Sequence, residues 1–414
     1  MSDERRAIEA LRAGVPNRAA IRLLGTTDNE ISERFVENLQ FCRQRLRDGE
    51  QPTGQVIAGG FGAGKSHLLG YLKELALAEN FVVSWVVISK ETPLFDLRKL
   101  YVSAVRNASV PGLNDDAMTA VLAKLRPKSE AYDDLCQWAQ SAEAGLSPLF
   151  PALLHLFPHP NTNPERIQQM ARLFSGAKLS FASVRQWLRE VGAVKLFPFK
   201  TIRQADLTRQ RLRFVPHLIA AAGYGGWVLL LDEVELIGRY SVLQRGRSYA
   251  ELARWLGLDA EERVPGVVTV AAVTDDFTGE VIGKRRDDEQ VPLKLASRNE
   301  RKTAERARLG MEVLEKKQVL LQAPSSASLE VSLNKIRGFY RDAYGWDVAG
   351  ADVGEITAAK SMRQYIKSWI TTWDLERLYN SRPEIETVKV APDYEENKDM
   401  ELMAAPSGDD PDDE

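Results

Sequence analysis

The sequence predicts an α/β fold in which a parallel β-sheet carries a phosphate-binding loop, and three observations support this. Residues 59–66 match the pattern G-x-x-x-x-G-K-[ST], between an apolar run and a helix-forming run. An apolar run at residues 228–231 ends in the carboxylate pair Asp232-Glu233. Strand-like and helix-like runs alternate from residue 227 to 321, which is typical of right-handed parallel crossovers. We therefore predict a P-loop NTPase core around a five-stranded parallel sheet.

The phosphate-binding loop (P-loop) follows the strand-like run Val56-Ile57-Ala58. Glycines let backbone N–H groups turn inward toward phosphate oxygens, and the helix that follows presents its positive end. We expect Lys65 to reach the β- and γ-phosphates and Ser66 to hold Mg²⁺. His67, in the first turn of that helix, is counted with the nucleotide-binding residues, although packing is the only role its position suggests. The expected nucleotide-binding residues of this segment are Gly59, Gly60, Phe61, Gly62, Ala63, Gly64, Lys65, Ser66 and His67.

The second chemical element is the acid pair at the end of the strand-like run 227–233. Asp232 is in the position to bind Mg²⁺, directly or through water. Hydrolysis also needs a base near the water that attacks the γ-phosphate, and Glu233 is the candidate. The alternative is an acid pair that only caps the next helix. The upstream P-loop favours the catalytic interpretation, so the sequence predicts hydrolysis as well as binding.

Thr274 follows the strand-like run 267–273, which we expect beside the P-loop strand. There its hydroxyl would sense the γ-phosphate or the attacking water, and we count it with Lys65 and Glu233 among the catalytic residues. The alternative is a threonine that begins a turn with the two aspartates after it. Arg363 is the candidate to reach the nucleotide from a C-terminal lid. Candidates for an arginine acting on a neighbouring subunit are Arg239, Arg245, Arg301, Arg306 and Arg308.

Hydrophobic patterning divides the remaining chain. Helical periodicity in residues 5–48 predicts an N-terminal helical segment, 1–50. The core comprises 51–89 and 227–325, with strands at 82–88 and 319–321 and helices at 248–257 and 297–317. Prolines at 151, 158, 160, 164 and 198 divide a helical insertion, 90–226. Helices near 326–345 and 356–380 form a helical lid, 326–385, and an acidic tail, 386–414, is expected to be disordered.

Composition restricts the function classes. The chain has 414 residues, 44% of them hydrophobic, with a net charge of −3, and it shows no signal-peptide core or apolar membrane span. We therefore expect a soluble cytoplasmic protein without membrane contact. Cys42 and Cys136 are its two cysteines, so neither a disulfide framework nor a zinc site is indicated. The acidic tail leaves a modestly basic body, and it either shields that body from polyanions or only aids solubility.

Nucleotide and nucleic-acid preferences are weaker signals. The guanine-reading motif Asn-Lys-x-Asp is absent, so ATP is the expected nucleotide. Residues 283–317 hold eleven basic side chains without interleaved aromatic residues, which a solvated helix face explains. If this stretch binds DNA, contact is expected with the phosphate backbone and not with the bases.

The order of these parts resembles that of the AAA+ ATPases, especially their origin-recognition and STAND-like branch. Residues 10–18 and the segment Gly223-Tyr224-Gly225-Gly226, which leads into Leu230-Leu231-Asp232-Glu233-Val234-Glu235, resemble more narrowly the ATP-binding proteins of BREX-type phage-defence systems. The resemblance spans residues 7–380. It implies an AAA+ core, an ATPase role in bacterial defence, and a helicase-like or other defence-system partner.

Three functions fit the sequence. The first is an Mg²⁺-dependent ATP-hydrolysing switch or motor that forms homo-oligomers and acts with DNA or a defence partner. The second is a nucleotide-dependent scaffold with little turnover, which recruits proteins through the insertion. The third, a small-molecule kinase, is disfavoured because a kinase does not need a hydrolytic glutamate after its Mg²⁺-binding acid.

Overall fold

A six-stranded β-sheet forms the centre of the computed structural model, which describes residues 2–14, 17–26, 28–113, 116–178, 180–321, 325–348, 361–380 and 394. The strand order is β3-β2-β4-β5-β1-β6. Every neighbouring pair is parallel except β2 with β3, which is antiparallel. The predicted count of five strands is therefore one short, because the two-residue edge strand β3 is too brief to leave a sequence pattern. The strands are β1 (Gln55–Ala58), β2 (Val82–Val87), β3 (Ala108–Ser109), β4 (Trp227–Asp232), β5 (Val267–Val273) and β6 (Gln318–Leu320).

Alternating side chains of the central strands pack on the two faces of the sheet, as the period of two in a strand requires. In β4, Leu229 and Leu231 join one apolar cluster, whereas Val228 and Leu230 join the other. Both sets are fully buried, so β4 reads as a continuous apolar run, which is typical of parallel strands covered on both faces. Because the whole of β5 is buried in the same way, its predicted bounds agree with the observed ones.

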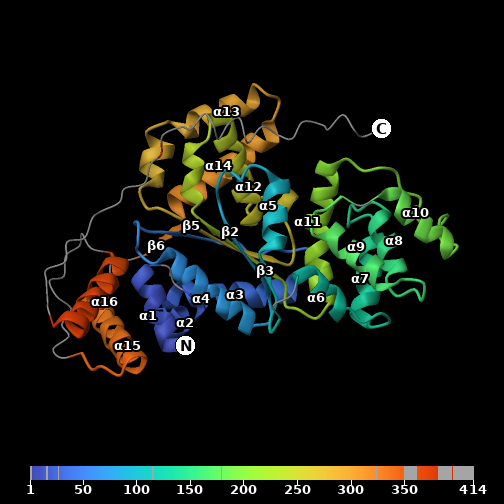
Figure 1. The fold of residues 1–414 in the computed structure, drawn as a ribbon. Coiled ribbons are helices and arrows are strands. Elements are labelled where there is room, and N and C mark those ends of the chain that lie inside the picture. Colours follow the sequence, from blue (N-terminus) through green and yellow to red (C-terminus); the bar gives the residue numbers. More distant parts are fainter. Residues whose placement is uncertain are drawn as a thin grey trace.

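Helices cover both faces of the sheet (Figure 1). Helices α3 and α4 pack on one face, and α5 (Leu97–Arg106), α12 and α14 on the other. Helix α13 and a preceding π-helical turn, η3, lack predicted counterparts. Helix α13 lies against α12 and α14, and η3 lies against α13 and α14. These core helices are α3 (Asn29–Arg45), α4 (Lys65–Ala78), α12 (Val242–Trp255), α13 (Asp287–Ala296) and α14 (Arg301–Lys316), with 3₁₀ turns η1 (Val234–Arg239) and η2 (Ala260–Glu262) and the π-turn η3 (Thr278–Gly283).

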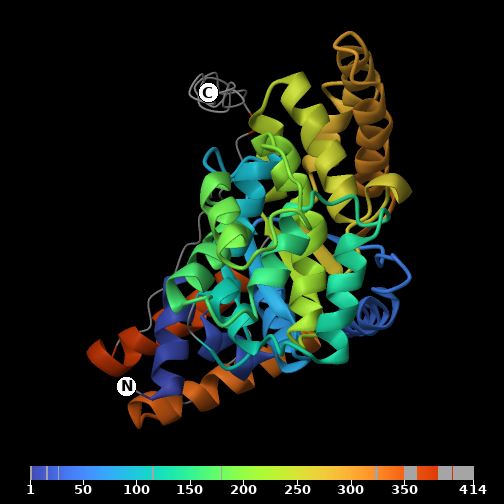
Figure 2. The ribbon, with the colours of Figure 1, turned by 90° about the vertical axis from the view of Figure 1, so that its right-hand side faces the viewer.

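The predicted insertion is mainly helical and extends to one side of the sheet, where it faces the viewer in Figure 2. Proline sets one helix boundary here, since Pro164 begins α9 directly after Asn163, whose side chain caps the helix. Pro151 instead lies in the first turn of α8, where a missing N–H costs no helical hydrogen bond. The helices are α5 (Leu97–Arg106), α6 (Ala117–Lys124), α7 (Glu130–Gln140), α8 (Leu149–Leu156), α9 (Pro164–Phe174), α10 (Phe181–Glu190) and α11 (Gln204–Ala221).

The first two and the last two described helices meet in one helical cluster beside β6 (Figures 1 and 2). Here α1 (Asp3–Ala13) and α2 (Arg18–Leu24) pack against α15 (Ser326–Tyr344) and α16 (Met362–Tyr379). Arg12 of α1 donates from Nε to a carboxylate oxygen of Asp374 in α16 over 2.7 Å. The sequence-based division separates these helices into an N-terminal segment and a lid, whereas their contacts join them.

Two predictions about the ends of elements fall partly outside the described residues. The predicted acidic tail lies outside them apart from Tyr394, and so do residues 356–360 of the last predicted helix. None of the helices in the described part of the chain combines the length and the apolar character that a membrane span needs.

Candidate functional site

The P-loop connects β1 to α4 at the carboxyl end of the sheet. Two of its glycines adopt positive φ angles, 80° at Gly62 and 109° at Gly64, which residues with a Cβ rarely tolerate. The N–H of Ala63 donates to the carbonyl of Gly60 over 3.1 Å and closes the turn. Helix α4 then begins at Lys65, so its free N–H groups lie at the end of the loop. This is the backbone arrangement that anion-binding loops use.

Lys65 is almost fully buried and lies across its own loop. Its ammonium donates to the carbonyl oxygens of Gly59, over 2.6 Å, and Gly60, over 3.2 Å. The charge is thereby held beside the loop's turn, where a bound phosphate would take over these hydrogen bonds. Lys65 therefore lies against the P-loop, and its contact with the phosphates stays a prediction.

The acid pair lies at the end of β4, separated from the P-loop strand by β5. Asp232 is 6% exposed, and its Oδ1 accepts a hydrogen bond from the N–H of Glu233 over 3.0 Å. Glu233 adopts a left-handed conformation with φ of 56°, which is uncommon for a residue with a side chain. Such strained backbone is enriched at functional sites. Partial desolvation and the charge of Asp232 raise the pKa of Glu233, while Lys65 opposes that shift.

A third carboxylate, which the sequence analysis did not single out, belongs to the same group. Glu235 lies in the turn η1 and is 9% exposed, and its Oε2 has no hydrogen-bond partner among the described residues. Burial raises its pKa to about 7, although a local backbone hydrogen bond and Lys65 favour the charged form. The pattern Asp232-Glu233-Val234-Glu235 contains the signal, because a turn that follows the strand can return the third acid to the site.

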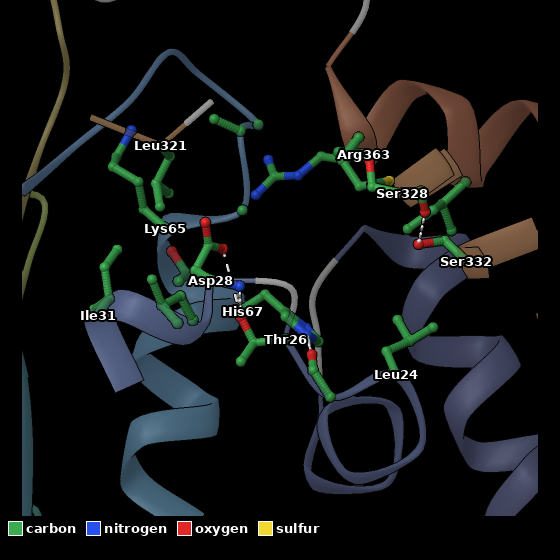
Figure 3. A pocket seen from close by; sticks show the side chains of 18 of the residues that line it. Leu24, Thr26, Asp28, Ile31, Lys65, His67, Leu321, Ser328, Ser332 and Arg363 are labelled. Carbon is green, nitrogen blue, oxygen red and sulfur yellow. Dashed lines mark hydrogen bonds between the residues drawn. The ribbon is translucent and has the colours of Figure 1, made fainter. Parts of the chain in front are cut away.

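One cavity of about 680 Å³ brings these residues together, which is within the usual size range of small-molecule sites. Its walls come from the P-loop, the acid pair, the segment between α2 and α3, and the helices α15 and α16. Figure 3 shows this cavity with Lys65, Asp28, Ser328 and Arg363 on different walls. The predicted site residues that line it are Phe61, Gly62, Ala63, Gly64, Lys65, Ser66, His67, Asp232, Glu233 and Arg363. Gly59 and Gly60 lie at the start of the same loop and accept the Lys65 hydrogen bonds.

Helix α16 begins directly over the P-loop. The N–H of Arg363 points to the carbonyl of Gly62 at 3.4 Å, and a Cβ on Gly62 would come within 2.7 Å of the Ser361 hydroxyl. The Arg363 guanidinium lies 5.3 Å from the centre of the Phe61 ring and extends into the cavity (Figure 3). The lid arginine that the sequence singled out therefore reaches the P-loop.

The N-terminal segment forms the opposite wall, and the sequence analysis did not assign it a place in the site. His67 contacts the carbonyl of Gly25 over 2.8 Å and so holds this segment to α4. Lys335 of α15 donates to the carbonyl of Leu24 over 2.6 Å. Burial raises the pKa of Asp28, which lines the cavity here with Thr26 (Figure 3). The role of His67 in this structure is thus to position a wall of the cavity.

Thr274 lies where strand order predicts, at the end of β5 and beside the P-loop strand. The residue before it accepts a hydrogen bond from the N–H of Gly59 over 3.2 Å. The Thr274 side chain is 2% exposed, however, and it is not among the residues that line the cavity. Its hydroxyl contacts that of Tyr394 instead. Its predicted sensor role is untested by these contacts.

The five candidate arginines for action on a neighbouring subunit differ in environment. Arg245 is 1% exposed and pairs with Asp287 over 2.7 Å, and Arg306 is 8% exposed and pairs with Asp259 over 2.8 Å. Both side chains are buried in ion pairs within the protein, so we exclude them as arginines that act on a neighbouring subunit. Arg239 is half-buried, whereas Arg301 and Arg308 are exposed and are the remaining surface candidates.

A parallel sheet with this loop, these carboxylates and one shared cavity defines the class as an α/β nucleotide-binding protein. Within that class, the family model for BREX system ATP-binding proteins BrxC/D matches residues 1–130 and 199–372, and the chain belongs to this family. Residues 131–198, the middle of the helical insertion, lie outside the match. Comparisons with curated proteins and with solved structures return no match. The predicted BREX resemblance is confirmed, and so is ATP binding as the family's stated property.

Glu235 makes a testable contribution to the pH dependence of stability. Because its folded-state pKa of about 7 exceeds the ordinary value of 4.5, the folded protein binds more protons between these limits, and stability falls as pH rises through them. Glu235→Gln should abolish this loss. From pH 5 to pH 8, the free energy of unfolding of the wild type should fall by about 2 kcal/mol relative to that of the variant, as measured by urea unfolding without nucleotide. Parallel pH profiles would contradict the assignment.

Proposed function

We propose that this protein is an Mg²⁺-dependent ATPase of the AAA+ type that acts as a switch in BREX defence. The supporting observation is that Lys65, Ser66, the acid pair and Arg363 line one cavity although they come from separate parts of the chain. Nucleotide that bridges the P-loop and α16 would link the core to the helical cluster. Bound nucleotide would then favour one arrangement of the core relative to the helical cluster.

The residues present fit ATP and Mg²⁺. The P-loop supplies backbone N–H groups at the start of α4 and a buried ammonium for phosphates, and the cavity has room for a nucleoside. Ser66 and Asp232 supply the oxygen ligands that Mg²⁺ prefers, with water and phosphate oxygens completing its shell. When bound, the metal ion neutralises charge on the β- and γ-phosphates.

Glu233 is the proposed base, because it follows the metal-binding acid and lines the cavity. It would accept the proton of the attacking water, and the Thr274 hydroxyl would donate a hydrogen bond to the γ-phosphate or to that water. Arg363 of α16 would respond to the nucleotide bound in the P-loop through its contact with Phe61. An arginine from a neighbouring subunit, with Arg301 and Arg308 as candidates, would complete the site in a homo-oligomer.

DNA and a helicase-like or other defence protein are the proposed partners. In the basic stretch 283–317, several side chains are paired with acids, among them Lys284 with Glu280 and Lys302 with Glu261. This pairing weakens the electrostatic attraction of the stretch for DNA phosphates. We therefore propose weak contacts with the DNA phosphate backbone, which salt readily disrupts. A scaffold role with slow turnover is the alternative function, favoured by the covered position of Thr274.

The ATPase rate of the full chain, measured alone and with single- or double-stranded DNA, tests the proposal. We expect Mg²⁺-dependent turnover that DNA or oligomerisation raises, and a change in particle mass between the ADP and ATP states. ATP that is bound tightly but is not hydrolysed under any of these conditions would support the scaffold instead. A chain that does not bind ATP would contradict both functions.

A further inference from the structure

Tyr394, far along the chain from the core, is docked on the turn that follows β5. Its hydroxyl donates to Oδ1 of Asp276 over 2.7 Å and also contacts the Thr274 hydroxyl at 2.5 Å. Its backbone carbonyl accepts a hydrogen bond from Arg285. These polar contacts tie both the side chain and the backbone of Tyr394 to residues 274–285.

The ring of Tyr394 occupies a shaped apolar site. It lies edge-on to Phe277, with ring centres 6.3 Å apart, and a Cβ on Gly238 would come within 3.2 Å of it. Gly238 belongs to η1, the turn that also carries Glu235, so the ring touches the elements that follow both β4 and β5. Tyr394 therefore contacts both the acid-pair turn and the Thr274 turn.

The direction of the hydrogen bonds follows from the number of protons available. A tyrosine hydroxyl has one proton, and Asp276, as a carboxylate, can only accept. The Tyr394 proton is thus committed to Asp276, and the short contact with Thr274 requires the threonine to donate. Burial raises the pKa of Tyr394 further above neutrality, so the phenol keeps its proton. The single hydroxyl proton of Thr274 is therefore directed to Tyr394.

We propose that Tyr394 is a positioning residue of the nucleotide site that holds Thr274 in a state unable to donate to the nucleotide. Phosphate oxygens only accept hydrogen bonds, so Thr274 can act on the γ-phosphate only after its proton is released from Tyr394. Undocking of Tyr394 would then permit rapid hydrolysis, and the docked state would be slow. This inference rests on the proposed ATPase function and on the sensor role of Thr274.

Tyr394→Phe in the full chain tests the inference, because it removes the hydroxyl and keeps the ring in its apolar site. The substitution removes both hydrogen bonds of the hydroxyl, the one to Asp276 and the one from Thr274. We expect kcat for ATP to rise about 10-fold, because releasing the Thr274 hydroxyl from its one hydrogen bond corresponds to ~1.4 kcal/mol. The KM for ATP should change less than about two-fold, since the binding residues are untouched. Tyr379→Phe, at an exposed tyrosine at the end of α16, is the matched control and should behave as the wild type.

A double mutant assigns the effect to Thr274. In a Thr274→Val background, Tyr394→Phe should no longer raise kcat, because no hydroxyl remains to be released. Wild-type hydrolysis with an unchanged kcat in Tyr394→Phe, or a rise that persists in the Thr274→Val background, would overturn the inference and leave the ATPase proposal standing. ATP binding without hydrolysis in both the wild type and Tyr394→Phe would overturn the two proposals together.

Discussion

Lys65→Ala is expected to lower ATP affinity by about 10- to 100-fold and to reduce hydrolysis by about 10³-fold. An ammonium that donates to phosphate oxygens makes charge-assisted hydrogen bonds, which are stronger than neutral ones. Its contribution grows in the transition state, where negative charge moves toward the leaving phosphate oxygen. Lys65 already lies over Gly59 and Gly60, so its charge is held at the loop where the phosphates are expected.

The measurements for this variant are equilibrium binding of a fluorescent ATP analogue and steady-state phosphate release. Lys294→Ala is the matched control, because Lys294 is exposed on α13 and does not line the cavity. Both variants should retain the wild-type circular dichroism spectrum. Unchanged ATP binding by Lys65→Ala would show that the triphosphate binds elsewhere, and the proposed function would then lose its site.

The parallel core could be predicted because the sequences of its strands fit few structures other than buried parallel strands. The run at residues 267–273 is apolar and mostly β-branched, and it forms β5 with the same bounds. The P-loop and the acid pair could be predicted because each joins a chemical pattern to a strand end. Once the strands are parallel, their carboxyl ends meet, and Lys65 and Asp232 must line the same edge of the sheet.

Tertiary contacts between distant segments could not be predicted in this way. The spacing of Ala7, Ile8 and Leu11 shows that one face of α1 is buried, but it does not say that α15 and α16 cover that face. The sequence gives still less indication that Tyr394 contacts the core, because a single aromatic residue in an acidic stretch has no periodicity. Glu235 is intermediate between the predictable strand ends and the unpredictable tertiary contacts. Its carboxylate beside the acid pair can be read from the sequence, but its burial depends on the turn η1.

Glu233→Gln is expected to reduce ATP turnover by about 10²- to 10⁴-fold while ATP affinity stays near that of the wild type. The amide keeps the size of the carboxyl and its place in the left-handed turn, but it cannot accept a proton from the attacking water. ATP should therefore bind and remain uncleaved, and any ATP-dependent oligomer should last longer. Single-turnover hydrolysis, nucleotide retention after gel filtration and particle mass measure these three results.

Glu235→Gln is the informative comparison, because this carboxylate lines the same cavity and is separated from Glu233 by one residue. If Glu233 is the base, Glu235→Gln should retain most of the turnover, since its carboxyl is buried and, with a pKa of about 7, largely protonated at pH 6. The reverse result, with Glu233→Gln active and Glu235→Gln inactive, would assign proton transfer to Glu235. Loss of turnover in both variants would mean that the two carboxylates act together, with Glu235 sustaining the charge or orientation of Glu233 through their shared electrostatic environment.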